Sequence, residues 1–229
     1  MSAPTARERL VAQLQLAYSG ELAAGYAYRG HWRSLKDPGE RTRIREIEEE
    51  EWHHRRLVGD MLRSLEASPR RAREVVFLII GRTLGAACHL AGWLLPIYGA
   101  GRLESRNVKE YEDAALYASD SGHPELIDCL LTMAEVEWEH ELYFREKAAG
   151  HPWRKYLPRW RIPGPKQSIR DPFPGFRSGD EPAPAPPVSS AGDEEQAGHG
   201  QEATPDDHRR PGGALPTDRG AGRRATRPM

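Results

Sequence analysis

The sequence contains few cysteines and no recognisable export signal. Cys88 and Cys129 are the only cysteines of the chain, and they form no Cys-x-x-Cys pair. This excludes a disulfide framework and a rubredoxin-type iron site. Residues 2–10 are mostly polar and charged, so we predict a cytoplasmic protein with reduced thiols.

Long apolar runs and a charge imbalance are also missing. The most apolar segment, residues 75–98, is interrupted by Arg82 and His89, so it falls short of the roughly 20 uninterrupted apolar residues of a membrane-spanning helix. The formal net charge is −1 at pH 7, which gives no general attraction to nucleic acid. We therefore expect no nucleic-acid partner and a function that comes from a local site.

The large apolar residues are concentrated in the first part of the chain. After residue 163 the sequence is rich in Pro, Gly, Ala, Arg and Asp, and such a composition cannot bury a core. Aromatic and basic residues alternate just before this point, in residues 153–161. We predict three parts: a helical bundle in residues 1–150, an aromatic and basic segment in residues 151–163, and a disordered tail in residues 164–229.

A Glu-x-x-His motif occurs in the second predicted helix, in one of two registers. Residues three apart lie on one face of a helix, so the carboxylate and the imidazole of such a pair can reach the same point. Glu51 and His54 follow the spacing of the apolar residues around them, whereas Glu50 and His53 share a face with Glu46. We predict that Glu51 and His54 point inward and that Glu50 and His53 are solvated.

The same motif returns as Glu137 and His140, and two single glutamates complete the pattern. Glu21 and Glu104 each lie on the apolar stripe of a further predicted helix, and each is followed seven residues later by a tyrosine, Tyr28 or Tyr111. The four predicted helices span residues 5–35, 40–65, 97–117 and 124–147.

These motifs predict a dinuclear metal site. One Glu from each of two helices and a Glu-x-x-His pair from each of two others is the ligand set of carboxylate-bridged di-iron and di-manganese bundles. Without a bound cation, so many ionisable groups on core stripes would be costly to desolvate. Carboxylate and imidazole ligands suit iron or manganese. The predicted ligands are Glu21, Glu51, His54, Glu104, Glu137 and His140.

Two segments outside this pattern each allow two interpretations. Residues 70–80 place four mostly basic residues before an apolar stretch, which is typical of an ordinary buried helix or of an element lying at a membrane surface. Residues 153–161 fit either a cap packed on the end of the bundle or an interfacial contact. A peripheral position at the inner face of the cell membrane is therefore compatible with the sequence.

Four short segments, with their spacing, resemble the demethoxyubiquinone hydroxylase family of ferritin-like di-iron monooxygenases. They are residues 18–24, 51–54, 81–86 and 137–140, and the similarity spans roughly residues 10–147. The resemblance implies an all-α, ferritin-like four-helix bundle with an extra apolar helix between the second and third ligand helices. It also implies two iron ions on the six predicted ligands, and O2-dependent hydroxylation of a quinone, a quinol or a similar aromatic ring.

The chain departs from that family in two places. After the third ligand, the family has a His-Tyr pair linked to substrate and electron delivery, and this pair is Glu110 and Tyr111 here. The resemblance implies catalytic roles for both residues. The C-terminal helix of the family is replaced by residues 153–161. For an apolar substrate, we expect residues 77–95 to form the wall of the entrance.

Several alternatives stay open at this level. The same bundle could hydroxylate another substrate, or act as a ferritin-like or rubrerythrin-like oxidase in iron or peroxide handling. A metal-free helical adaptor would leave six inward ionisable groups unexplained. A mixed manganese and iron pair suits the same ligands. No dinucleotide-binding fingerprint is present, so the sequence does not indicate the electron donor. A homodimer is compatible with the sequence.

Overall fold

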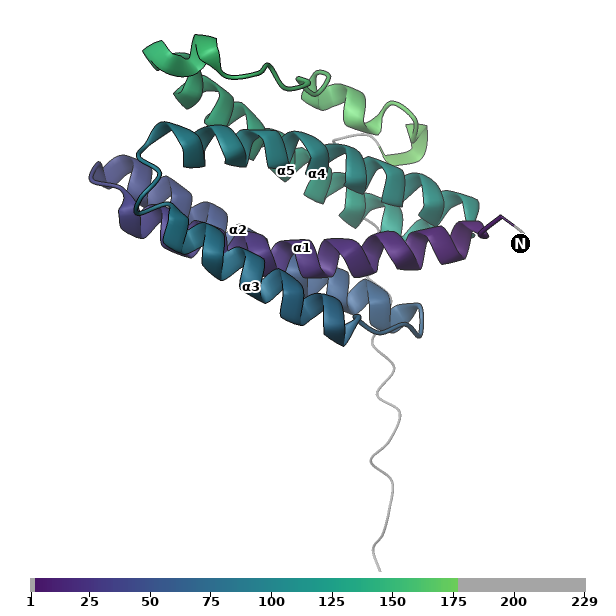
Figure 1. The fold of residues 1–229 in the computed structure, drawn as a ribbon. Coiled ribbons are helices and arrows are strands. Elements are labelled where there is room, and N and C mark those ends of the chain that lie inside the picture. Colours follow the sequence, from purple (N-terminus) through teal and green to yellow (C-terminus); the bar gives the residue numbers. More distant parts are fainter. Residues whose placement is uncertain (1–2, 177–229) are drawn as a thin grey trace, which may run out of the picture. The chain divides into compact units, whose positions relative to one another are not determined.

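The computed structural model describes residues 3–176, which are built from helices and connecting loops without a strand (Figure 1). The predicted disordered tail lies outside the described residues from 177 onward. Five long helices follow one another: α1 (Ala6–Ser34), α2 (Pro38–Ser64), α3 (Arg71–Ala87), α4 (Leu94–Asp120) and α5 (Ile127–Ala149). A short 3-10 turn, η1 (Pro124–Leu126), lies between α4 and α5, and three more follow α5: η2 (Pro152–Tyr156), η3 (Lys166–Arg170) and η4 (Pro174–Phe176). The predicted all-α class is confirmed.

The helices start at residues that satisfy their free backbone amides. Thr5 and Glu8 form a capping box at the start of α1, in which each side chain accepts a hydrogen bond from the other's backbone amide. Asp37 caps α2 in a similar way, and Pro38 occupies its first position, where its missing N–H costs nothing. These caps fix where α1 and α2 begin, and the apolar stripe of each helix determines which of its glutamates face inward.

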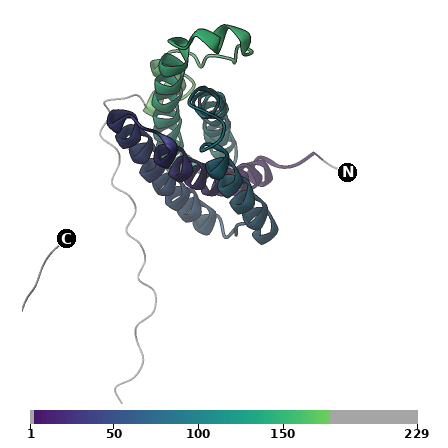
Figure 2. The same ribbon diagram turned by 60° about the vertical axis from the view of Figure 1, so that its left-hand side comes forward.

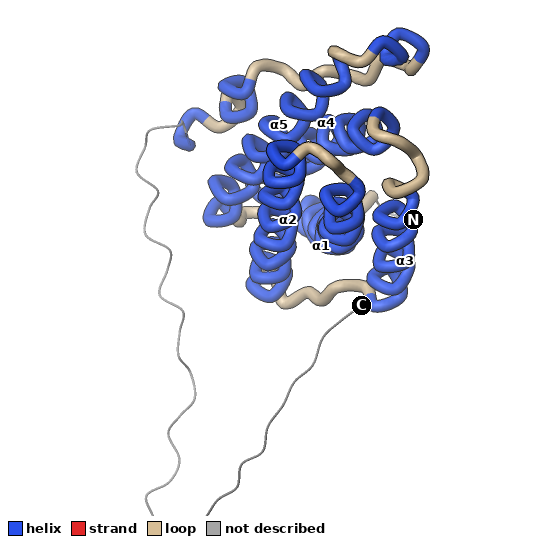
Figure 3. The backbone as a smooth tube through the Cα atoms, turned by 90° about the vertical axis from the view of Figure 1, so that its left-hand side faces the viewer, coloured by secondary structure: helices blue, strands red, loops and turns tan. Residues whose placement is uncertain are grey.

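Helices α1, α2, α4 and α5 form the bundle, and α3 is the extra helix. Helix α1 packs against α2, α3 and α4, while α4 packs along α5. In the tube view, α1 lies between α2 and α3 (Figure 3). The end-on view shows the α4 and α5 pair beside the layer of the first three helices (Figure 2). The predicted extra apolar helix is thus confirmed, on the outer side of α1.

The hydrophobic core is divided into two clusters, and the predicted ligands lie between them on all four bundle helices. In α5, for example, Leu130 and Met133 belong to one cluster and Phe144 to the other, with Glu137 and His140 between. The same change from one cluster to the other occurs at Glu21 in α1, at Glu51 and His54 in α2, and at Glu104 in α4. A polar layer therefore crosses an otherwise apolar interior.

Helix α3 approaches α1 closely because glycines face the contact. An added Cβ at Gly81 would lie 2.5 Å from the backbone oxygen of Ala23, and one at Gly30 would lie 2.3 Å from the Cα of Gly85. We predict that Gly81→Val lowers the free energy of unfolding by about 2–3 kcal/mol, because the two backbones must separate. Gly99→Ala is the control, since a Cβ there meets nothing within 4 Å.

Chemical denaturation of both variants tests this prediction. The control should be neutral or slightly stabilising, because alanine is the better helix former. An unchanged midpoint for Gly81→Val would show that α3 is not held against α1 by this contact.

The interpretation of α3 as an ordinary buried helix is wrong. Among its residues only Gly81 and Gly85 are buried, whereas Val75, Val76 and Ile79 are each more than half exposed. Composition alone does not reveal this, because an apolar helix can be covered either by neighbouring helices or by something outside the chain. No helix among the described residues is long and apolar enough to cross a membrane.

The boundary predicted for the disordered tail is wrong for residues 164–176. Ile169 and Phe173 are buried in the hydrophobic core. Arg170, which is nearly buried, forms ion pairs with Glu135 at 2.6 Å and with Asp128 at 2.7 Å. These contacts hold residues 164–176 against α5, although Ile169, Arg170 and Phe173 lie in a stretch that is otherwise rich in proline and glycine.

Part of the aromatic and basic segment packs across α4 and α5. Trp160 packs against the core cluster that contains Phe144, and its indole N–H donates to Glu141 at 2.9 Å. Tyr98 of α4 donates to the backbone oxygen of Pro158 at 2.8 Å. The packed-cap interpretation of residues 153–161 therefore accounts for Trp160, while Trp153 stays 68% exposed.

Candidate metal centre

The six predicted ligands meet in the polar layer of the bundle. Their carboxylate oxygens and imidazole nitrogens form two groups, and within each group the ligand atoms lie within 4.8 Å of one another. Each of the six side chains belongs to a residue that is 3% exposed or less. One group contains Glu21, Glu51, His54 and Glu137, and the other contains Glu51, Glu104, Glu137 and His140.

Glu51 and Glu137 belong to both groups. A carboxylate has two oxygens, so each of these residues can offer one oxygen to each group. The other four residues belong to one group only. This arrangement matches the ligand logic of a dinuclear site, with two shared carboxylates and one terminal carboxylate and one imidazole for each position.

The unpartnered atoms of the cluster show that its residues fit metal ions. Both carboxylate oxygens of Glu51, one oxygen of Glu21 and Nδ1 of His140 are buried without a hydrogen-bond partner. Buried polar atoms without partners are costly. Two divalent cations would satisfy them and would offset the four carboxylates.

Burial and mutual repulsion govern the protonation of the cluster. Burial, helped by the charge of Glu51, raises the pKa of Glu21 well above its usual range, and burial with the charge of Glu137 does the same for Glu104. Burial alone would also raise the pKa of Glu137, but hydrogen bonds with His140 and His54 hold it well below its usual range. Protons therefore occupy part of the cluster when no metal is bound.

Metal binding should become stronger as pH rises. Glu21 and Glu104 have raised pKa values in the fold, so their contribution to the stability of the metal-free protein is complete below the pKa of an unfolded glutamate. It is lost as pH rises through the raised values. The depressed pKa of Glu137 has the opposite effect, because its contribution is lost only in strong acid. Metal ions replace the protons that leave.

We therefore expect the gain in melting temperature on adding Fe²⁺ or Mn²⁺ to increase between about pH 6 and about pH 8. Differential scanning fluorimetry of metal-free and metal-loaded protein, under anaerobic conditions for iron, measures it. A gain that falls with pH would contradict this protonation pattern.

Two tyrosines cross the bundle to brace the single glutamates. The Tyr111 hydroxyl donates to Glu21, and the Tyr28 hydroxyl donates to Glu104. Each tyrosine lies seven residues after one of the glutamates in sequence, but it contacts the glutamate of the other helix. The regular spacing of these pairs is visible in the sequence, whereas the exchange of partners follows from the antiparallel packing of α1 and α4.

Glu50 is only partly solvated. Its side chain is 39% exposed, but its Oε2 lies 2.6 Å from Nε2 of His140, a contact that the register prediction missed, while His53 is exposed as predicted. The spacing of apolar residues reports only on α2 itself, whereas the contact of Glu50 depends on a histidine that α5 brings to the edge of this face.

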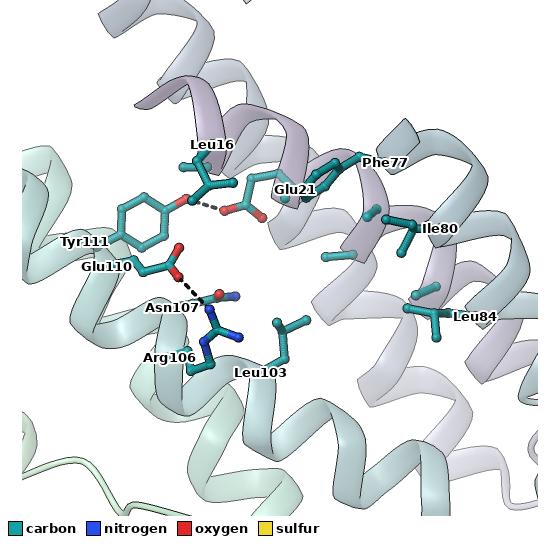
Figure 4. A pocket seen from close by; sticks show the side chains of 15 residues that line it. Leu16, Glu21, Phe77, Ile80, Leu84, Leu103, Arg106, Asn107, Glu110 and Tyr111 are labelled. Carbon is teal, nitrogen blue, oxygen red and sulfur yellow. Dashed lines mark hydrogen bonds and ion pairs between the residues drawn. The ribbon is translucent and has the colours of Figure 1, made fainter. Parts of the chain in front are cut away.

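A pocket of ≈ 270 Å³ opens from the polar layer between α1, α3 and α4. Figure 4 shows Phe77, Ile80 and Leu84 of α3 on one side and Glu110 of α4 on the other. Glu21 and Tyr111 also line it, so the pocket reaches a predicted ligand directly. An apolar molecule with a polar ring fits such a lining.

Glu110 is part of the polar wall of this pocket. Gln13 donates to its carboxylate at 3.4 Å, and Arg106 approaches it at 3.6 Å. Burial raises its pKa, although Arg106 opposes the shift. Asn107, which no sequence motif indicates, lies in the same wall and donates to Glu104 at 2.8 Å.

A second apolar pocket of ≈ 400 Å³ adjoins the first. Ala24, Ala27, Leu84 and Leu103 line both pockets. Phe77, Leu84 and Leu95, which fall within the segment expected to form an entrance wall, each line at least one of the two. Because they share lining residues, the two pockets form one apolar trough, which reaches the polar layer at Glu21.

These features define the class of the protein as an all-α helical bundle with a buried carboxylate and imidazole cluster that could hold metal ions. Residues 8–143 match the family described as "Ubiquinone biosynthesis protein COQ7". The chain belongs to this family, which supports a role as an enzyme in ubiquinone biosynthesis and confirms the resemblance in the sequence. No curated protein and no solved structure matches the chain.

Proposed function

We propose that the protein is a di-iron monooxygenase of the demethoxyubiquinone hydroxylase type. The observation that carries this proposal is the pair of overlapping ligand groups, which share Glu51 and Glu137 and open through Glu21 onto an apolar pocket. The reaction would insert one atom of O2 into a quinone or quinol ring and release the other as water. It consumes two electrons and two protons for each ring.

The residues of this chain would bind and orient the reactants. The six ligands would hold two iron ions, which supply the oxygen activation that side chains cannot provide. Tyr111 fixes the orientation of Glu21 through its hydroxyl. The apolar side chains of α3 would pack against the apolar part of the substrate, and Glu110 would offer a polar group to a ring oxygen. The electrons would come from NADH, a reductase or the reduced substrate.

The exposed face of α3 supports a peripheral contact with a membrane, where a lipidic quinone would be found. Val76, Ile79 and Leu84 are exposed to between 49 and 60%, and a patch of this kind marks an interaction surface. Flotation with lipid vesicles tests this part of the proposal. The double variant Val76→Glu with Ile79→Glu should stay in the soluble fraction and keep its metal content, and co-flotation equal to wild type would contradict the contact.

A direct test of the reaction is reconstitution with Fe²⁺ without oxygen, followed by exposure to ¹⁸O2 with short-chain demethoxyquinols and a chemical reductant. Mass spectrometry should show one ¹⁸O atom in the ring of the product. Iron oxidation without any hydroxylated product would instead favour a ferritin-like or rubrerythrin-like oxidase.

Glu110 provides a test of the substrate class. Glu110→His places the residue type of the resembled family in the pocket wall. If the ring binds against this wall, the variant should change the KM for quinol analogues severalfold and leave the metal content unchanged. An unchanged KM for every analogue would place the ring elsewhere.

A further inference from the structure

The two candidate histidine ligands differ in how their outer nitrogens are held. Nε2 of His140 lies 2.6 Å from Oε2 of Glu50. His54 uses Nδ1 to contact Glu137 at 3.0 Å, and within residues 3–176 its Nε2 has no hydrogen-bond partner. The two halves of the cluster are therefore alike in ligand type but not in their surroundings.

Glu50 is placed to orient the imidazole of His140. Arg43 lies 3.4 Å from the Glu50 carboxylate, which is 39% exposed, so this carboxylate keeps its charge at modest cost. With Nε2 anchored, Nδ1 of His140 faces Glu51 at 3.4 Å and Glu137 at 3.6 Å. A carboxylate on the outer nitrogen of a metal-binding histidine fixes the ring and makes the other nitrogen a better donor.

A second difference lies in the single glutamates. Glu104, which belongs to the group of His140, accepts hydrogen bonds from Asn107 at 2.8 Å and from Tyr28. Glu21, in the group of His54, accepts only from Tyr111, and its other oxygen has no partner. Glu21 also lines the apolar pocket, whereas Glu104 does not.

We infer that the two metal positions are unequal, with Glu50 as the positioning residue that makes them so. The position formed with Glu104 and His140 fills first and holds its ion tightly. The position formed with Glu21 and His54 binds more weakly and faces the substrate pocket. This inference rests on the proposed dinuclear centre, and it adds an order of filling that the centre itself does not require.

The inference is tested by anaerobic titration of the full chain with Fe²⁺ or Co²⁺. Calorimetry measures binding of either metal, and the visible spectrum reports on bound cobalt. The wild type should bind two ions in two resolved steps. Glu50→Gln keeps the size of the side chain and removes its charge, so the affinity of the first step should fall by roughly 10–100-fold while the second step stays unchanged. Glu50→Ala should reduce the first step at least as much.

Glu46→Gln is the matched control. Glu46 lies one turn before Glu50 on α2 and also pairs with Arg43, at 3.3 Å, but it has no contact with His140. This variant should titrate as the wild type does, and circular dichroism should show that all three variants are folded.

Three outcomes would overturn the inference. These are two equal steps in the wild type, an unchanged first step in Glu50→Gln, or the same loss in Glu46→Gln. A wild type that binds no metal at all would overturn the proposed function as well, so the two failures are distinguishable.

Discussion

Glu137→Gln is expected to remove both metal ions, because Glu137 belongs to both ligand groups. The substitution keeps the size of the side chain but replaces a charged oxygen by a neutral amide, which is a poor ligand for iron in this setting. Bound iron should fall from about two ions per chain to near zero. The apparent metal affinity should drop by more than about 100-fold. Even the loss of a residue that only hydrogen-bonds to a metal ligand can lower metal affinity by up to about 100-fold, and Glu137 would be a ligand itself.

The effect is best measured against two other variants. Glu139→Gln changes an exposed residue of the same helix that pairs with Lys166, and it should bind metal as the wild type does. Glu21→Gln removes a ligand of one group only, so about one ion per chain should remain. Elemental analysis after reconstitution provides the counts. If Glu137→Gln keeps one ion per chain, the shared role of Glu137 is wrong.

Spacing along single helices accounts for most of what the sequence predicted correctly. Glu51 and His54 were separable from Glu50 and His53 because a buried face repeats every three or four residues. Proline and glycine also indicated the helix breaks before α2 and at residues 121–123, although the first break lies at residues 35–37 and not at the predicted residues 37–39, since α2 begins at Pro38. These are local properties, so a single sequence is enough to see them.

The features that the sequence did not reveal all depend on a second element. Glu50 contacts a histidine that α5 supplies, and Tyr28 braces a glutamate of α4. The exposure of α3 depends on which helices cover it. Ile169 and Phe173 are single apolar residues in a polar stretch, and only the surface of α5 and its neighbours gives them a core to join. Spacing rules carry no information on such contacts.

Ala27→Phe should block substrate binding without disturbing the metal centre. Ala27 lines both apolar pockets, lies six residues after Glu21 on α1, and belongs to neither ligand group. A phenyl ring there would fill space at the part of the trough that lines both pockets. Losing the burial of one aromatic ring of the substrate is worth about 1.5–3 kcal/mol, which corresponds to roughly 10–150-fold in binding.

The variant should therefore show a KM for short-chain quinol analogues that is higher by that factor, with iron content and iron oxidation by O2 unchanged. Ala149→Phe is the control, because Ala149 is exposed at the end of α5 and far along the chain from both pockets. If Ala27→Phe leaves the KM unchanged, the ring does not reach the metal centre through this trough. If it abolishes iron binding, the bulk has displaced α1 instead, and the less bulky Ala27→Leu would separate obstruction of the pocket from distortion of the bundle.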